Sequence, residues 1–247
     1  VSPALQADRI LPVLCAIRAA PDPLGSIPIS IDTTSSLVAE SMLLAGADAI
    51  NDISAGLDDP AMLPLIAQHG AGIILMHRLA IPSLDRYSDA YETPPTYDDV
   101  ITVVRDFLSA RANAALAAGI PREAIVLDPG LGFGKSVQQN LDLIARTREL
   151  TRLGFPILSA LSRKSFVGRA SLARDSAPAE RLIGSIALSV AHALAGAALF
   201  RIHDVAEHAQ AMMATAPILA PRPLLPAAEA SPPTLPPNRL STGPLPA

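Results

Sequence analysis

Short apolar runs that each end at a polar residue recur six times along the chain. The clearest is Ile125–Leu127, which is followed directly by Asp128 and the turn-forming pair Pro129-Gly130. Continuous apolar runs of this length are typical of strands that are buried on both faces, as in a parallel sheet. The pattern therefore predicts six strands, at Ile27–Asp32, Ala47–Asp52, Gly72–His77, Ala124–Asp128, Pro156–Leu161 and Ala198–His203.

Segments with the hydrophobic spacing of helices lie around and between these strands. Glycine closely follows five of these segments, and glycine readily adopts the left-handed backbone that ends a helix. The predicted helices are Gln6–Ala20, Thr34–Leu44, Pro60–Gln68, Thr96–Ala118, Val137–Leu153, Ala179–Leu194 and Val205–Ala214.

Alternating strands and helices predict βαβ units and an α/β fold with a parallel sheet. A (β/α)8 TIM barrel gathers all of its strand ends on one rim, whereas a doubly wound sheet gathers its ligand groups at a switch point. The barrel is favoured because all six strands end in a polar group. Since the chain opens on a helix with no strand before it, we expect six of the eight βα units, with two N-terminal strands missing before Val1.

One folded domain is expected over residues 1–217. Residues 218–247 are rich in proline and alanine and lack apolar periodicity, so they are expected to form a disordered tail. The polar stretch 78–95, which contains Tyr87 and Tyr91, is expected to be a long loop covering the barrel rim.

Composition and charge exclude several classes of protein. The chain has 247 residues, 50% of them hydrophobic, a net charge of −4 and a pI near 5.7, which argues against a nucleic-acid or anionic-membrane surface. It has neither an apolar run of the roughly 20 residues that span a bilayer nor a signal-like start, so a cytoplasmic protein is expected. The single cysteine, Cys15, lies in an apolar segment and is expected to be a buried structural thiol.

The polar residues at the strand ends are candidate functional groups, and each also has an ordinary structural explanation. Asp128 closes a buried strand, where a carboxylate is costly without a partner, although Asp before Pro-Gly can also cap a turn. Asp32 is equally compatible with capping a helix, and Asn51-Asp52 with forming a turn. For His77, a core position is favoured.

Cations gather at the last two strand ends. Lys164 follows one strand, and Arg201 and His203 lie two residues apart and so point to the same side. Two carboxylates and an amide suit the donor edge of a planar heterocycle, and a lysine suits its carbonyl oxygen. Arg201 and His203 suit a leaving phosphate or diphosphate. The segment PGLGFGKS is only a weak match to a phosphate-binding P-loop, because proline replaces the first glycine.

With these residues identified, the chain resembles the dihydropteroate synthases, a family of pterin-binding barrels, over residues 1 to about 217. The resemblance rests on five segments in this order: ISIDT, AGADAINDIS, LDPGLGFGK, LSRKSFVG and RIHDV. It implies condensation of p-aminobenzoate with 6-hydroxymethyl-7,8-dihydropterin diphosphate, release of pyrophosphate, and Mg²⁺ on the diphosphate. No covalent nucleophile is expected, because loss of diphosphate from an electron-rich pterin drives the reaction in this family.

The resemblance also implies roles for individual residues. The pterin would be held by Asp32, Asn51, Asp128 and Lys164, in a pocket lined by Met76 and Phe133. The p-aminobenzoate site would be bordered by Ser162 and Arg163, and the diphosphate held by Arg201 and His203. The residues expected to be catalytic are Lys164, Arg201 and His203.

The sequence departs from the family pattern in its N-terminal part. Family members carry an NVTPDSF-like loop and an STRPG-like loop, which supply Mg²⁺ ligands and help to form the p-aminobenzoate site, and neither is found here. The Mg²⁺ ligands are therefore expected in the missing N-terminal segment. The loop after Met76 also reads HRLAIPS where members often show HMRGTP. Family members are commonly homodimers, although nothing in this sequence identifies an interface.

Two other functions remain open. The first is the pterin-binding domain of a corrinoid-dependent methyltransferase, which shares the Asp/Asn pocket but needs no cationic corner for diphosphate. The second is a non-catalytic pterin-binding module that truly starts at Val1. An incomplete barrel exposes sheet edges and core, so such a module is expected to be poorly stable unless chains pair.

Overall fold

The computed structural model describes residues 2–80, 93 and 95–219. These residues form six strands at the six predicted places, each shorter than predicted. The strands are β1 Ser30–Asp32, β2 Ala49–Asp52, β3 Gly72–Met76, β4 Ile125–Asp128, β5 Leu158–Ser159 and β6 Leu199–Phe200.

All of the strand pairs are parallel, which confirms the predicted α/β class. Four strands form one sheet in the order β1-β2-β3-β4, and β5 pairs with β6 in a second. A single parallel bridge between Leu127 and Ile157 joins the two, with the Leu127 amide donating to the Pro156 carbonyl at 3.0 Å. The interpretation of these strands as six of eight barrel units stays a prediction.

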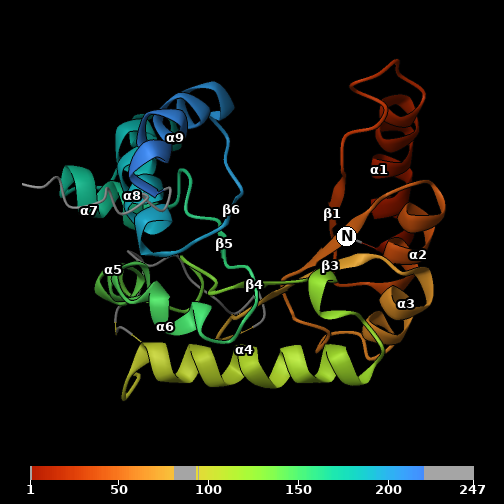
Figure 1. Ribbon diagram of the computed structural model, residues 1–247, viewed down its shortest axis with the longest axis horizontal. Helices are drawn as coiled ribbons and strands as arrows, with labels where there is room; N and C mark the ends of the chain where they lie inside the picture. The colour runs from red at the N-terminus through yellow and green to blue at the C-terminus, as the bar shows by residue number, and fades with distance from the viewer. Residues whose placement is uncertain (1, 81–92, 94, 220–247) are drawn as a thin grey trace, which may run out of the picture.

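Helices surround the strands (Figure 1). Helices α1 to α3 lie on one side, α7 to α9 lie on the other, and the long α4 runs along the bottom of the view. The helices are α1 Pro3–Arg18, α2 Ser36–Leu44, α3 Met62–His69, α4 Val100–Ala117, α5 Val137–Ala145, α6 Thr147–Thr151, α7 Ser165–Leu172, α8 Leu182–Ala195 and α9 Val205–Leu219. Two 3-10 turns, Arg122–Ala124 and Pro178–Arg181, precede β4 and α8. Helix α7 was not among the predicted helices.

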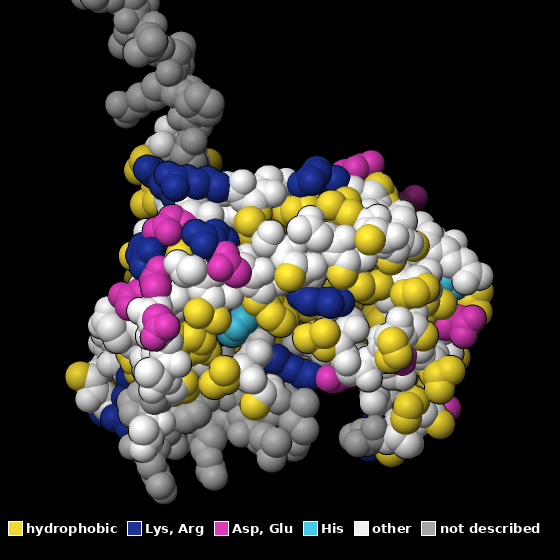
Figure 2. All heavy atoms as spheres, turned by 90° about the horizontal axis from the view of Figure 1, so that it is seen from below, with side chains coloured by type: hydrophobic (Ala, Val, Ile, Leu, Met, Phe, Trp, Pro, Cys, Tyr) yellow, Lys and Arg dark blue, Asp and Glu magenta, His cyan; other side chains and the backbone are white. Residues whose placement is uncertain are grey.

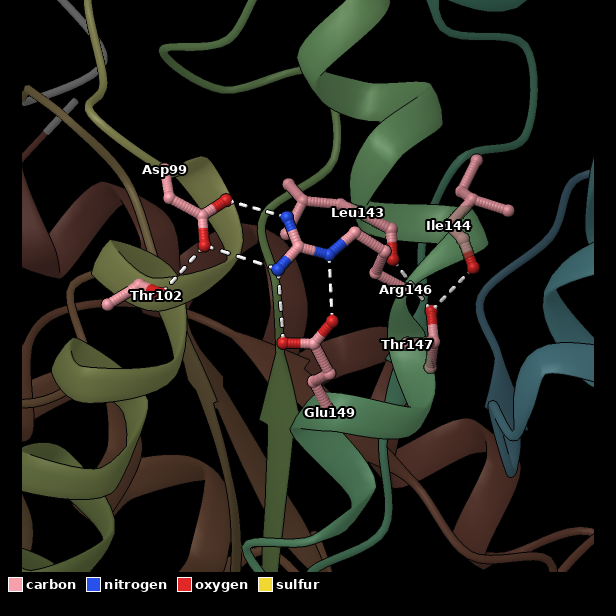
Figure 3. A network of polar contacts seen from close by, with 7 residues as sticks. All are labelled: Asp99, Thr102, Leu143, Ile144, Arg146, Thr147 and Glu149. Atoms are coloured by element: carbon pink, nitrogen blue, oxygen red, sulfur yellow. Dashed lines mark hydrogen bonds and ion pairs between the residues drawn. The ribbon is translucent and has the colours of Figure 1, made fainter.

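The predicted single helix over Val137–Leu153 is wrong, because it breaks at Arg146 (Figure 3). The Arg146 guanidinium binds the Asp99 carboxylate before α4 at 2.7 Å and the Glu149 carboxylate in α6 at 2.7 Å. The Thr147 hydroxyl donates to the carbonyls of Leu143 and Ile144, at 2.8 and 2.9 Å. The break thus places one arginine where it ties α6 to the start of α4.

Two other expectations near the chain ends are overturned. Cys15 is exposed rather than buried, because α1 turns only Leu14 fully inward against α2 and leaves the neighbouring position outside. Helix α9 does not stop before Pro217 but continues through it to Leu219. The predicted tail lies outside the described residues from position 220 onward, and so do Tyr87 and Tyr91 of the predicted rim loop.

The register of the sheet brings the candidate residues to one level. Asp32 of β1 lies opposite Asn51 of β2, and Met76 of β3 lies opposite Asp128 of β4. The strand interiors behind them are buried, as at Ile50, Leu75 and Leu127. Parallel strands all end at the same edge, so this register fixes one polar face above one apolar core.

No helix in the described part of the chain is both long and apolar enough to cross a bilayer. On the face drawn in Figure 2, hydrophobic side chains are spread across the surface, and acidic and basic side chains lie intermixed.

Candidate active site

Asp128 is a deeply buried carboxylate at the end of β4. Its side chain is only 2% exposed, and the Gly130 amide donates to its Oδ1 at 2.7 Å. Burial raises the pKa of Asp128, and the charge of Lys164 is the largest of the effects that oppose this rise. Capping of the Pro129-Gly130 turn therefore explains the role of Oδ1 of Asp128 but not that of Oδ2.

Asn51 and Asp52, at the end of β2, point to different partners. Asp52 accepts hydrogen bonds from the Ser54 amide and hydroxyl, at 2.8 and 2.7 Å, and from the Gly56 amide at 2.7 Å. For Asp52, the structure thus shows the turn-forming role that was the structural explanation of Asn51-Asp52. The Oδ1 of Asn51 is buried, in a residue that is 8% exposed, and the described residues offer it no hydrogen-bond partner. Such an orphaned acceptor is costly unless a ligand donates to it.

Asp32, at the end of β1, does not cap the following helix. The amide of Ser36 in the first turn of α2 donates to Asp59 at 2.8 Å instead. The Asp32 carboxylate lies 3.6 Å from the Arg201 guanidinium, and both side chains are about half exposed, at 52% and 55%. Asp32 is therefore available at the pocket mouth.

Lys164 lies between β5 and α7 and faces the loop after β4. Its ammonium donates to the Leu131 carbonyl and stands 4.4 Å above the ring of Phe133. Burial lowers the pKa of Lys164 to about 8, although the Asp128 carboxylate opposes this. A Cβ added at Gly132 would fall 2.7 Å from Cδ of Lys164, so glycine is required for this approach.

A hollow of about 330 Å³ is lined by Ser30, Asp32, Asn51, Ile74, Leu158, Phe200 and Arg201. Two other hollows at this end of the strands hold the predicted site residues. The smaller, of about 140 Å³, contains most of the predicted pterin residues; its lining is Asp32, Asn51, Ile53, Met76, Asp128, Phe133, Ala160, Lys164 and Arg201. The larger, of about 500 Å³, contains the predicted p-aminobenzoate and diphosphate residues; its lining is Ala160, Ser162, Arg163, Lys164, Ser165, Pro178, Arg181, Arg201 and His203. Lys164 and Arg201 line both hollows, so a ligand in one would meet a ligand in the other there.

The residues of the larger hollow are fixed by hydrogen bonds. Nδ1 of His203 lies 3.1 Å from the Ser162 hydroxyl, which also accepts from the His203 amide at 3.3 Å. The Arg163 guanidinium binds Asp204 through two nitrogens, with Nε to Oδ2 at 3.0 Å. Arg163 has a φ of +61°, and the Ser185 hydroxyl accepts from its amide at 2.9 Å.

His77 and Lys135 form a buried pair behind the smaller hollow. His77 is 4% exposed and lies edge-on to the Phe107 ring at 5.0 Å, which confirms the core position favoured for it. Sequence reasoning assigned no role to Lys135, because its segment matched a P-loop poorly. A signal was nevertheless present: the chain contains only two lysines, Lys135 and Lys164, and both follow predicted strand ends.

A metal site is not evident among the described residues. Within residues 2–80, 93 and 95–219, no group of three or more His, Cys, Asp or Glu side chains could hold a metal ion. The described residues therefore do not by themselves fit Mg²⁺.

Comparison with known proteins agrees with this arrangement. The profile of the family described as "Pterin binding enzyme" matches residues 1–203. A dihydropteroate synthase from Synechocystis is 42% identical over 204 residues, which make up 82% of this chain and 66% of that relative. This chain thus spans about two thirds of that relative's length.

Solved structures show the same likeness. The dihydropteroate synthase of Xanthomonas albilineans with 4-aminobenzoic acid has a TM-score of 0.78 at 34% identity, covering 89% of this chain and 76% of that one. The Thermus thermophilus enzyme in complex with 6HMPPP has a TM-score of 0.73 at 37% identity, covering 86% of this chain and 77% of that one. Together with the strand-end geometry, these matches show that the chain belongs to the pterin-binding enzyme family and, within it, to the dihydropteroate synthases.

Proposed function

We propose that this chain condenses p-aminobenzoate with 6-hydroxymethyl-7,8-dihydropterin diphosphate and releases pyrophosphate. The observation that carries the proposal is the pair of hollows that share Lys164 and Arg201. A buried pocket with two carboxylates beside a wider, cationic one suits a planar heterocycle joined to a diphosphate. Related structures, one with 4-aminobenzoic acid and one in complex with 6HMPPP, support the same pair of ligands.

The smaller hollow would bind the pterin. The Asp128 carboxylate would accept two N–H groups from the amino-pyrimidine edge, because a carboxylate accepts paired donors well. The unpartnered Oδ1 of Asn51 would accept a further N–H, and Asp32 would accept at the pocket mouth. Met76 and Phe133 would pack against the faces of the ring, and Lys164 would donate to its carbonyl oxygen.

The larger hollow would hold the diphosphate and p-aminobenzoate. Arg201 and His203 would bind the diphosphate, while Ser162 and Arg163 border p-aminobenzoate. The amine nitrogen of p-aminobenzoate attacks the methylene carbon of the pterin, and the carbon–oxygen bond to the diphosphate breaks. The electron pair leaves with the diphosphate, and Lys164, Arg201 and His203 stabilise the negative charge that develops there. The attacking amine loses its proton after the new bond forms.

The cationic corner favours a synthase over the two other functions. A methyltransferase domain would bind its pterin without needing Arg201 and His203 next to the pocket. A module that only binds pterin would not need a second, cationic hollow that shares Lys164 with the pterin pocket. No step is assigned to Mg²⁺, because the described residues do not provide a site for it. A cytoplasmic location, expected from sequence features, and a homodimer, expected from the family resemblance, also remain proposals.

The test is turnover of the purified chain. With pterin diphosphate, p-aminobenzoate and Mg²⁺, dihydropteroate and pyrophosphate are expected in equal amounts. Asp128→Asn should abolish most of this product, whereas Asp106→Asn, at an exposed carboxylate on α4, should not change the rate. Pterin binding without any product would contradict the synthase proposal and favour a non-catalytic pterin-binding module.

A further inference from the structure

Lys135 is a fully buried cation that the proposed mechanism does not use. It is 0% exposed and is the largest side chain buried to that degree. The chain carries only one other lysine, Lys164, whose charge also lowers the pKa of Asp128. Burying an ammonium is expensive, so its presence calls for a physical reason.

Three acceptors among the described residues contact the Lys135 ammonium. Its Nζ donates to the carbonyls of Gly130 and Phe133, at 3.0 and 2.8 Å, and contacts Nδ1 of His77 at 3.0 Å. Burial, with the nearby Lys135 charge, lowers the pKa of His77 to about 3, so its ring is neutral and Nδ1 can accept. Acceptors placed around Nζ are the arrangement expected of a protonated lysine, which offers donors only.

The same contacts lead directly to Asp128. Gly130 accepts from Lys135 through its backbone carbonyl, and its backbone amide donates to Asp128 Oδ1 at 2.7 Å. The His77 amide donates to the Asp128 carbonyl at 3.0 Å. Gly130 has a φ of +69°, and a Cβ there would fall 1.8 Å from the His77 carbonyl oxygen, so this knot admits only glycine.

We propose that Lys135 is a positioning residue that keeps Asp128 ionised and holds Phe133 in place, so that the pocket retains its acceptor for the pterin. This inference rests on the proposed function and adds a residue to it. Lys135 acts through its hydrogen bond to the Gly130 carbonyl and through its charge, without touching the substrate.

The charges around Asp128 set the expected size of the effect. Burial raises the pKa of Asp128, while the cations Lys164, Lys135 and Arg201 lower it, and His77 beside Lys135 is neutral. Removing one of these cations leaves burial less opposed, so the pKa of Asp128 should rise further. A change of about one pH unit is expected from losing one nearby charge.

The primary test follows the Asp128 carboxyl itself, without a ligand. The protein is labelled with 13Cγ-aspartate, the signal is assigned with Asp128→Asn, and its titration is followed by NMR. Lys135→Met should move the midpoint upward by about one pH unit. Lys135→Gln, which keeps an N–H donor but no charge, should do the same, and far-ultraviolet circular dichroism confirms that each variant is folded.

Tyr97→Phe is the matched control, because the Tyr97 hydroxyl donates to the Gly134 carbonyl of the same loop at 2.7 Å. This variant loosens the loop without changing a charge and should leave the Asp128 midpoint in place. An equal shift in Tyr97→Phe, or none in either folded Lys135 variant, overturns the proposal.

A second measurement separates this proposal from the proposed function. Binding of 6-hydroxymethylpterin, followed by calorimetry from pH 4 to 8, should weaken toward acid with a midpoint that rises in Lys135→Met. If the unaltered protein binds no pterin, the proposed function fails, and the aspartate titration still decides the role of Lys135.

A third measurement needs no substitution at Lys135. With 13Cε-lysine, the unaltered protein gives two signals, and Lys164→Met identifies the other as Lys135. The Lys135 signal should keep the shift of an ammonium at pH 7. A neutral amine there would overturn the proposal even if no Lys135 variant folds.

Discussion

The two hollows at the strand ends differ in the exposure of their lining residues and, under the proposed function, in the charge of the ligand that each would bind. The smaller contains Asp128 and Asn51, which are 2% and 8% exposed, whereas the larger contains Arg163, whose side chain is 35% exposed, and the half-exposed Arg201 lines both. A neutral heterocycle is recognised by hydrogen bonds that gain strength only when water is excluded. A diphosphate carries enough charge to be held by cations that remain in water. Under the proposed function, the buried polar side chains therefore lie where the uncharged part of the substrate binds.

The largest expected effect comes from removing the buried acceptor. Asp128→Asn should weaken pterin binding by about a hundredfold, because a charge-assisted pair of hydrogen bonds is lost in a buried site. Asp32→Asn, at a half-exposed carboxylate, should cost less than about tenfold. Calorimetry with 6-hydroxymethylpterin measures both. Equal losses would show that burial does not distinguish the two acceptors.

The cationic corner should affect only the phosphorylated substrate. Arg201→Ala and His203→Ala should raise the KM for the pterin diphosphate by about tenfold or more, because each removes a donor to a charged group. Binding of 6-hydroxymethylpterin, which has no diphosphate, should change little in His203→Ala, because His203 lines the larger hollow and not the smaller one. Steady-state kinetics and calorimetry on the same samples separate the two hollows, and a matching loss in both would contradict their division of labour.

Lys164 lines both hollows, and its titration should appear in the pH profile. Because the folded pKa of Lys164 is about 8, its ammonium is lost above that pH, and kcat/KM should fall on the alkaline side. Lys164→Arg, which stays protonated, should lower the rate but remove that alkaline limb. A limb that survives in Lys164→Arg would belong to another group.

A smaller effect concerns stability below neutral pH. Burial lowers the pKa of His77 to about 3 and of His192 to about 4, so both stay neutral when folded while the unfolded chain takes up protons below about 6.5. The free energy of unfolding should therefore fall, by on the order of a few kcal/mol, as pH drops from about 6.5 to 4.

His77 lies behind the smaller hollow, whereas Nδ1 of His192 contacts the Ser159 hydroxyl of β5 at 2.9 Å. His192→Gln should flatten the pH dependence of urea unfolding, while His69→Gln, at the end of α3, should not. If the free energy of unfolding depends on pH in His192→Gln as it does in the unaltered protein, the acid sensitivity would be assigned to His77 alone.

Much of the candidate site can be predicted from the sequence. Buried parallel strands are recognisable as apolar runs, and the polar residues at their ends lie at the same edge of the sheet. Asp32, Asn51 and Asp128 were found in this way, and the structure brings them to one hollow. Their helix-capping and turn alternatives could not be decided from sequence, since capping depends on residues distant in the chain. Only the fold shows that Asp59, and not Asp32, accepts from the first turn of α2.

Other predictions failed where local signals compete with long-range contacts. The apolar spacing from Val137 to Leu153 continues without interruption, yet an ion pair to Asp99, 47 residues away, accompanies a break at Arg146. Cys15 lies in an apolar stretch but faces outward, because α1 packs against α2 along a narrow line that passes through Leu14. Neither result is encoded in neighbouring residues.

The sequence by itself determined the parallel α/β class, the six strand positions and the polar group at each strand end, because these depend on local periodicity and chain direction. Only the tertiary structure decided that two hollows share Lys164 and Arg201, and that Lys135 turns inward toward Gly130 and His77. Whether a charge binds a ligand or supports a loop depends on burial and on partners brought from other strands, and a linear sequence does not specify these.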